Sequence, residues 1–331
     1  MHSIDITNHY MLVRINRPES KDEFKQMLLA LKQYVKEDPH VVIYTLDTLK
    51  QTIIMGTGEQ HLNEILDRLV HKFDLNIDAQ RPEVLYKETF GEAVNSEGSF
   101  IRQASSIGRY GRCHLRIEPQ ARNAGYEFIN HIHSEGILPY EYIPSIDDGV
   151  QCSMLDYIVS CFPIVDVKVT LFDGSHHPMD SSQMSYKIAA SIAFRNGLKQ
   201  SGFVILEPIV SVTFNGVADD VVILEQCLHS MKWRTERFQR ETGLIDVITE
   251  ISMREWLSAK EEIQSIIGQK YECHVELRYY DAIPEHLKEQ IVKESSLRSA
   301  SHTDLLYWER QSKENEEWYM NEFIDEFWEE T

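Results

Sequence analysis

Apolar residues follow two different periods over the first 80 residues of the chain. They recur every three or four positions over 20–36 and 59–72, which predicts two helices that each bury one face. Ser20 and Glu23 have the spacing of a capping box at the start of the first helix. Short β-branched runs predict four strands, at 10–16, 40–46, 51–55 and 73–79. The order β-α-β-β-α-β is typical of a small ferredoxin-like sandwich.

The same order of elements returns over 207–280, although the two segments have different sequences. The predicted strands and helices lie, in chain order, at 209–214, 218–231, 235–241, 245–253, 255–267 and 271–280. Two domains of similar architecture are therefore expected on either side of a middle region.

The middle region mixes extended segments with two helical patterns. Its extended segments are 84–90, 99–103, 109–118 and 125–131. They are followed by a helix at 145–160, an apolar strand at 162–172, a helix at 181–199 and a strand at 202–206. Asp180 or Ser181 is the expected N-cap of the second helix. This order predicts an α/β domain with an exposed loop at 173–180.

The distribution of charge sets one segment apart from the rest of the chain. The 331 residues hold 33 Lys and Arg against 53 Asp and Glu, a net charge of −20, which excludes indiscriminate binding to nucleic acid. The segment 101–122 is the exception, because it carries a single acid, Glu118, and five arginines: Arg102, Arg109, Arg112, Arg116 and Arg122. On a strand, Arg112, His114 and Arg116 share one face. They could bind phosphate, with Tyr110 stacking on a base, or pair with acids of the chain itself.

The end of the chain is acidic and aromatic. From Ser296 onward there are ten acidic and three basic residues, so about a third of the net charge lies there. We expect this segment, 296–331, to be helical. Either it packs back on the preceding domain or it recruits a partner, and exposed aromatic patches are uncommon on monomers.

Several kinds of chemistry are disfavoured by the sequence. No Gly-Lys pair occurs, so the phosphate-binding loop GxxxxGK[ST] is absent. The five cysteines are dispersed without a CxxC motif, which favours a reducing cytosol over a disulfide framework. No secretory leader and no apolar run of membrane-spanning length appear, so we expect a soluble cytoplasmic protein.

Two glycine-containing turns are further candidates. Gly56 and Gly58 precede a predicted helix, as in an anion-binding helix start or in an ordinary strand-to-helix turn. The turn 173–180 holds His176 and His177, which could ligand a metal but are more typical of an exposed helix entry. Ser175 lies in no GxSxG motif, which argues against a hydrolase.

A set of motifs in a fixed order resembles the C-terminal half of elongation factor G, the translational GTPase that drives ribosomal translocation. The resemblance covers roughly residues 8–295. The segments that carry it are 37–39, 56–62, 81–89, 103–111, 139–144, 165–171, 173–182 and 207–208. It implies an α+β protein in which two ferredoxin-like split βαβ sandwiches flank an α/β domain of the ribosomal-protein-S5-like type.

The resemblance also implies a division into domains. Residues 1–80 correspond to domain III, 81–206 to domain IV and 207–295 to domain V, while the acidic aromatic tail 296–331 lies outside the family pattern. In domain IV, the loops 134–144 and 173–180 form the tip that contacts the tRNA–mRNA duplex in the A site. The implied tip residues are Ser175, His176, His177, Gly136 and Pro139.

Other functional residues follow from the same resemblance. Glu59 and His61 fall in the domain III motif that relays the nucleotide state. Candidates for ribosomal RNA contact are Arg102, Arg109, Tyr110, Arg112 and Arg116. Two domain V motifs depart from the family pattern, around Met231 and over 256–268, which weakens the implied contact with the large subunit.

The sequence therefore predicts the ribosome-binding half of an elongation-factor-G-like protein, a divergent paralogue that acts as a monomer on the ribosome. It implies no catalytic residue, metal or cofactor in this chain, since GTP and Mg would bind in an N-terminal half that carries the G domain. Two alternatives stay open. One is a ribosome-protection or stress-specialised factor, and the other is a GTPase-free interaction protein that uses its tail.

Overall fold

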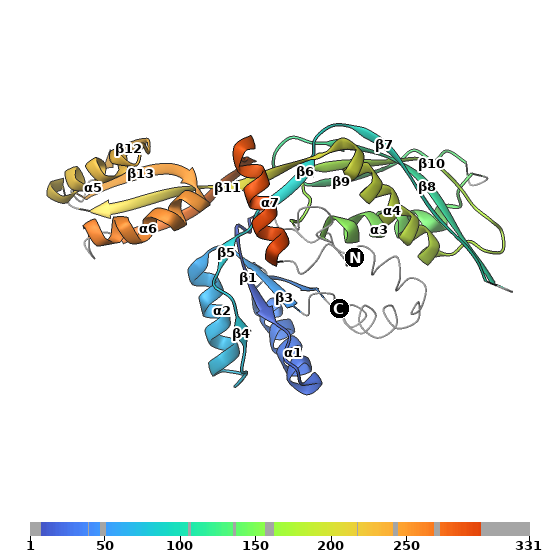
Figure 1. The fold of residues 1–331 in the computed structure, drawn as a ribbon, viewed down its shortest axis with the longest axis horizontal. Helices are drawn as coiled ribbons and strands as arrows, with labels where there is room; N and C mark the ends of the chain where they lie inside the picture. Colours follow the sequence, from blue (N-terminus) through green and yellow to red (C-terminus); the bar gives the residue numbers. More distant parts are fainter. Residues whose placement is uncertain are drawn as a thin grey trace.

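The computed structural model describes residues 8–298 except for 39, 47–50, 105–106, 135–136, 156–161, 217, 241–243 and 268–271. Three sheets divide the chain into an N-terminal, a middle and a C-terminal domain (Figure 1). The expected helix beyond residue 298 lies outside the described residues, as does Gly136 of the predicted tip.

The N-terminal domain has the predicted β-α-β-β-α-β order. Its elements are β1 (Met11–Asn16), α1 (Lys21–Glu37), β2 (Val42–Leu46), β3 (Gln51–Gly56), α2 (Glu59–His71) and β4 (Asp78–Ala79). The antiparallel sheet has the strand order β2-β3-β1-β4, which is that of a ferredoxin-like sandwich. The Ser20 side chain accepts a hydrogen bond from the Glu23 N–H, so the predicted cap of α1 is confirmed.

One predicted strand of this domain is much shorter than expected. The segment 73–79 forms only the two-residue strand β4. After α2, Asp74 takes a left-handed backbone conformation with φ of 53°, and the Leu75 N–H bonds back to the Leu69 carbonyl. The chain therefore turns where an extended run was expected.

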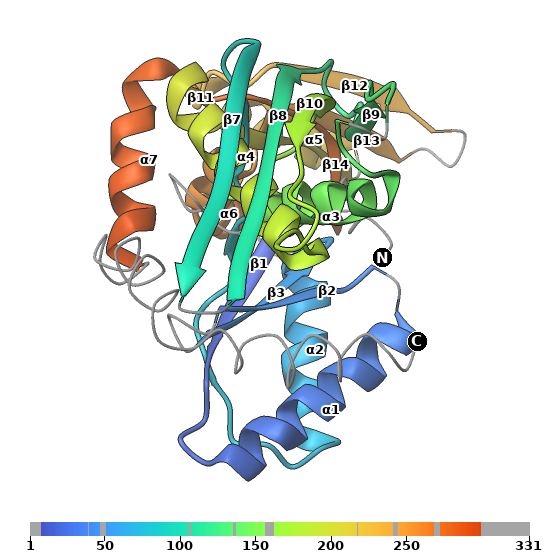
Figure 2. The ribbon, with the colours of Figure 1, turned by 90° about the vertical axis from the view of Figure 1, so that its right-hand side faces the viewer.

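The middle domain is a sheet covered on one face by two helices. Its strands are β7 (Val94–Ala104), β8 (Ile107–Pro119), β9 (Tyr126–Asn130) and β10 (Val167–Ser175), in the order β7-β8-β10-β9. Only β9 and β10 run parallel among these neighbours. The helices α3 (Ile143–Leu155) and α4 (Gln183–Ser201) share a core with the sheet (Figures 1 and 2).

Two boundaries in the middle domain differ from the prediction. The strand expected at 162–172 begins at Val167, because buried Asp166 has φ of 55° and its carboxylate accepts the N–H groups of Asn123 and Gly125 at 3.1 and 3.0 Å. The N-cap of α4 is Ser182, whose side chain accepts from the Ser185 N–H, rather than either of the two preceding residues.

The C-terminal domain repeats the ferredoxin-like order. Its elements are β11 (Phe203–Gly216), α5 (Ala218–Ser230), β12 (Thr235–Gln239), β13 (Ile245–Ser252), α6 (Met253–Ile267) and β14 (Glu272–Ala282), and α7 (Glu285–Arg298) follows. The strand order is β12-β13-β11-β14. The predicted α+β class with two sandwiches around a different central domain is thus confirmed.

The single strand β11 replaces two predicted strands, at 202–206 and 209–214. Its first residues pair with β6 (Lys87–Phe90) up to Leu206, and its later residues pair with β13 from Ile209 onward. Pro208, which lacks an N–H, falls in the gap between these two partners on that edge. The proline therefore does not end the strand, and β11 passes from the middle domain into the C-terminal domain.

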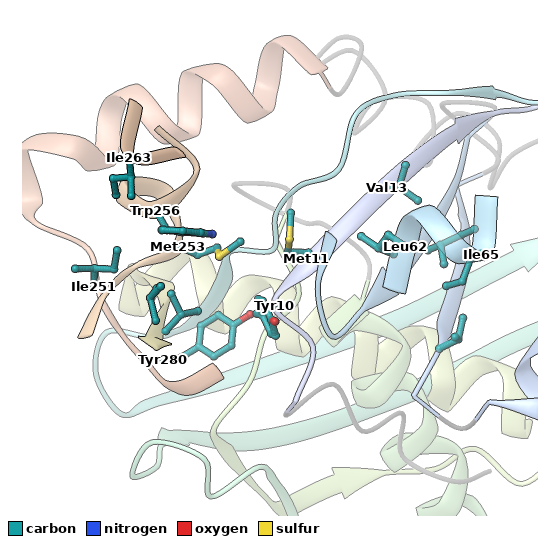
Figure 3. Close-up of a cluster of buried hydrophobic side chains, with 14 of the residues drawn as sticks. Tyr10, Met11, Val13, Leu62, Ile65, Ile251, Met253, Trp256, Ile263 and Tyr280 are labelled. Atoms are coloured by element: carbon teal, nitrogen blue, oxygen red, sulfur yellow. The ribbon is translucent and has the colours of Figure 1, made fainter. Parts of the chain in front are cut away.

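The two outer domains meet in a common hydrophobic core. Tyr10 and Met11 of the N-terminal domain belong to the same buried cluster as Met253, Trp256 and Tyr280 of the C-terminal domain (Figure 3). The middle domain has a core of its own. The short strand β5 (Glu83–Val84) pairs with β1 and leads from the N-terminal domain into the middle domain.

Candidate nucleic-acid interface

The turn between β10 and α4 presents His177 at one end of the middle domain. The His177 N–H donates to Ser181 Oγ at 2.9 Å, and His177 Nδ1 lies 3.1 Å from Asp180 Oδ2. The imidazole is half exposed, whereas the next apolar side chain, Met179, is 86% exposed. With Nδ1 held by the turn, Nε2 has no partner among the described residues and is available to a ligand.

The β7–β8 hairpin packs directly against this turn. The Tyr110 N–H donates to the Asp180 carbonyl at 2.8 Å, and the Tyr110 and Ser175 hydroxyls lie 2.7 Å apart. The Tyr110 and His177 ring centroids are 6.2 Å apart. A Cβ atom at Gly108 would lie 2.3 Å from the Asp180 carboxyl carbon, so a larger residue there would have to displace the Asp180 side chain. The hairpin therefore fixes the position of the histidine turn.

The predicted partner loop at 134–144 contributes in a different way. Leu138 is fully buried, and Pro139 precedes a short 3-10 helix, Tyr140–Tyr142. The Tyr142 ring stacks on Tyr186 of α4 with centroids 4.6 Å apart. Tyr186 in turn donates to the Ser175 carbonyl at 2.9 Å. This loop supports the base of the histidine turn.

Sequence reasoning missed the residues that hold His177 in place. Asp180 and Ser181 were considered only as helix caps, and Tyr110 only as an RNA-contact candidate. The available signal was the pair of glycines, Gly108 and Gly111, in the hairpin, since glycine often marks the close approach of another backbone. A Cβ atom at Gly111 would lie 2.4 Å from the Ser185 carbonyl oxygen of α4.

Two arginines of β8 pair with acids of the same sheet, as one of the two interpretations predicted. Arg112 Nε lies 2.7 Å from Glu97 Oε1, and Arg116 bonds to Glu118 at 3.0 Å. The hydrogen bond from Arg112 lowers the pKa of the Glu97 carboxyl, and that from Arg116 lowers the pKa of Glu118. The two guanidinium side chains remain 42% and 52% exposed, so they can still contact an anion.

The remaining RNA-contact candidates lie near the end of the hairpin. Arg102 and Arg109 occupy opposite positions on β7 and β8. The Arg102 guanidinium also lies 5.1 Å from the centre of the Phe100 ring. This end of the hairpin, beside the histidine turn, is therefore rich in cationic side chains.

The domain III motif forms a turn that is satisfied internally. His61 Nδ1 accepts the Thr57 N–H at 3.2 Å, so Nε2 carries the proton that faces Asp38 Oδ2 at 3.1 Å. This geometry fits the strand-to-helix interpretation of the glycine turn. Glu59 instead bonds to Lys260 of α6 at 2.5 Å, which links the N-terminal and C-terminal domains.

Metal and membrane sites can be assessed for the described residues. Within them, no group of three His, Cys, Asp or Glu side chains is placed to hold a metal ion. His131 and His133 stack on each other with ring centroids 6.3 Å apart. No helix in the described part of the chain is long and apolar enough to cross a membrane.

Comparison with known proteins gives two family matches, and solved structures match as well. Residues 10–81 match the family description "Elongation Factor G, domain III", and residues 82–202 match "Elongation factor G, domain IV". A crystal structure of a protein from Thermus thermophilus superimposes with a TM-score of 0.63 at 25% sequence identity. That alignment covers 90% of this chain and 44% of the other, so the chain spans less than half the length of that relative.

Proposed function

Since this chain belongs to the elongation factor G family of translation factors, we propose that its middle domain enters the A site of the ribosome and promotes translocation of tRNA and mRNA. The observation that carries this proposal is the histidine turn, in which His177 is half exposed while its backbone and Nδ1 are held from within. A side chain fixed in this way reaches a ligand without losing much conformational freedom on binding.

The proposed mechanism is steric and electrostatic and includes no bond chemistry. His177 Nε2 and the polar groups of the turn would replace contacts that hold the codon–anticodon duplex in place. Tyr110 braces the turn through its backbone bond to Asp180. Ser175 and His176 immediately precede His177, and the Arg102–Arg109 pair would face the phosphates of neighbouring RNA.

We assign the timing of translocation to a G domain that is separate from this sequence. The sequence lacks a phosphate-binding loop, and the matched domains are III and IV. We therefore assign GTP and Mg binding to a separate G domain. The Glu59–Lys260 ion pair would carry a displacement of the N-terminal domain to the C-terminal domain. We assign the C-terminal domain the role of domain V and place the protein in the cytoplasm as a monomer.

A ribosome cosedimentation assay tests the proposal. The full chain is expected to pellet with ribosomes at low salt and to compete with A-site tRNA, and His177→Ala should weaken that competition by about tenfold, the effect of losing about 1.4 kcal/mol. The matched control is His133→Ala, which removes an exposed histidine of the same domain. Absence of cosedimentation, or equal competition by both variants, would contradict the proposal.

A further inference from the structure

The outward face of α1 combines lysines with aliphatic side chains. At 3.6 residues per turn, a set of seven residues without an acid falls within about 120° of the helix circumference. These residues are Lys21, Lys25, Leu28, Leu29, Lys32, Val35 and Lys36. Leu29 is 58% exposed and Val35 is 39% exposed, whereas the buried side chains of α1 lie outside this arc. We call this surface the lysine face of α1.

Contacts within the N-terminal domain leave the lysine face positive. Among the described residues, no carboxylate partner is found for three of its lysines, Lys21, Lys25 and Lys36. The helix α2 packs along a different flank of α1, where Arg68 lies over the Tyr34 ring and bonds to Glu37. The lysine face is on the outside of its domain, away from the middle-domain sheet (Figures 1 and 2). A positive surface on a chain whose net charge is −20 is complementary to an acidic segment.

The acidic aromatic tail has the composition that complements this surface. Residues 299–331, which follow α7, include ten acidic and two basic residues, a net charge of −8, so the other 298 residues carry −12. They also include seven of the 33 aromatic residues of the chain. A segment of this kind suits a surface that offers cations together with apolar contact. Lysine provides both, because its stem packs on aromatic rings while its ammonium group meets a carboxylate.

The domain that precedes the tail is a poorer partner for it. Val222 and Ile223 are exposed on α5, but that helix contains three acids and no lysine or arginine, so it would repel the tail. On the edge strand β12, Arg237 is already paired with Glu225, and the arginine that follows the strand is paired with an aspartate. Charge therefore favours the lysine face of α1 over the C-terminal domain.

We propose that the lysine face of α1 binds residues 299–331 of the same chain, with tail carboxylates paired to its lysines and aromatic rings packed on Leu29 and Val35. Exposed ion pairs are individually weak, but an attached segment has an effective concentration on the order of millimolar, so weak contacts suffice. A chain of 33 residues extends up to about 110 Å, so its length does not prevent contact with α1. Docking would withhold the lysine face from other anionic partners.

Carbodiimide cross-linking of the full chain tests the contact directly, because the reagent joins an amine to a carboxylate where the two are in contact. At 50 mM salt and low protein concentration, we expect cross-links between residues 299–331 and the lysines of α1 within the monomer. They should exceed tail cross-links to Lys199, an exposed lysine in the last turn of α4, about tenfold, which corresponds to about 1.4 kcal/mol. At 1 M salt, where the screening length is about 3 Å, the excess should disappear.

Charge reversal on α1 gives a second measurement, which uses tryptophan fluorescence. Three of the five tryptophans lie in the tail, Trp308, Trp318 and Trp328. In the triple variant Lys25→Glu, Lys32→Glu, Lys36→Glu, repulsion should release the tail. The emission maximum should then shift to longer wavelength, and acrylamide should quench the emission more strongly than in the unchanged chain.

The matched control is the triple variant Arg122→Glu, Lys199→Glu, Arg237→Glu. It makes the same change of net charge at exposed positions of the middle and C-terminal domains. Emission and quenching should stay as they are in the unchanged chain. Circular dichroism checks that both variants fold, and the cross-links of the unchanged chain do not depend on either variant.

Three outcomes would overturn the proposal. Absence of tail cross-links at the α1 lysines would show that the tail does not lie there. Cross-links confined to covalent dimers would assign the lysine face to a second copy of the chain. Equal effects of the two triple variants would reduce the response to net charge. None of these measurements involves ribosomes, so this proposal and the proposed function fail separately.

Discussion

Buried phenols at the contact between the outer domains make the molecule sensitive to alkali. Burial, followed by the nearby Glu276 carboxylate, raises the pKa of Tyr10 to about 12. Burial raises the pKa of Tyr280 well above its usual value, and its hydroxyl lies 2.7 Å from the His9 carbonyl oxygen and 2.9 Å from that of Leu85. These groups stay neutral in the folded chain at a pH where they ionise after unfolding.

Tyr10→Phe should therefore flatten the pH dependence of stability above pH 10. A folded pKa raised from 10 to about 12 means that stability is complete below pH 10 and is lost as pH rises through 12. The loss is up to about 1.4 kcal/mol per pH unit for each such tyrosine. Urea unfolding between pH 9 and 11.5 measures the slope, which should be shallower in the variant.

The same variant at pH 7 is its own control. There the phenol is protonated in both states, and the substitution removes only the long 3.4 Å contact with the Val275 carbonyl. The free energy of unfolding should change by less than about 1 kcal/mol. Identical slopes for both proteins above pH 10 would show that ionisation of Tyr10 does not limit stability.

At the scale of elements, β7 and α4 of the middle domain approach each other closely at Gly98. A Cβ atom at Gly98 would lie 1.8 Å from the Ala189 carbonyl oxygen and 2.5 Å from the Ala193 nitrogen. Both obstacles belong to the backbone of α4, which cannot move away as a flexible side chain could. Glycine at this position lets the helix rest directly on the strand.

Gly98→Ala is therefore expected to destabilise the middle domain by about 3 kcal/mol, the upper part of the range for overpacking. Thermal or urea unfolding followed by circular dichroism measures the change. Ser99→Ala on the same strand is the control, because Ser99 is exposed and should cost less than about 0.5 kcal/mol. A Gly98→Ala chain as stable as the control would mean that α4 can shift on the sheet.

The elements that were predictable from sequence are those set by local periodicity. Both ferredoxin-like domains follow from helices and strands whose apolar positions repeat within a few residues. The exceptions are set by partners distant in sequence. Asp166 delays the start of an expected strand by binding two N–H groups more than 40 positions earlier, and Pro208 is tolerated because β6 and β13 leave it a gap.

The candidate site was even less predictable from the sequence, because its contacts also join residues that are distant along the chain. The residue types at the tip could be assigned by motif, but the contact between Tyr110 and the turn at Asp180 joins positions 70 residues apart. The pairing of Arg112 and Arg116 with acids could be stated as one of two alternatives, since strand alternation fixes a face and not a partner. The strand β10 also has a bulge at Phe172, which leaves no sign in an apolar run.

At the scale of the whole molecule, the shared core predicts that the outer domains lose structure together. Met253→Ala removes a buried side chain of the C-terminal domain that lies near Met11 and Tyr10 (Figure 3). It should cost about 2–5 kcal/mol. Amide hydrogen exchange should accelerate in β1 and α2 of the N-terminal domain as well as in β13.

Leu115→Ala provides the comparison, because Leu115 is equally buried but belongs to the separate core of the middle domain. It should accelerate exchange in β8 and β10 and leave β1 at its original rate. If Met253→Ala changed exchange only within its own domain, the two outer domains would open independently and the common core would not couple them.

The strand β11 connects the middle domain to the C-terminal domain as one continuous extended segment. Its 14 residues extend over roughly 46 Å, and backbone pairing joins its first residues to β6 and its later residues to β13 and β14. The N-terminal domain is attached to the C-terminal domain chiefly by side chains, through the common core and the Glu59–Lys260 pair. A tilt of about 10° at one end of a strand of this length displaces its other end by about 8 Å. A rotation of the C-terminal domain would therefore move the middle domain with it and change the position of the histidine turn.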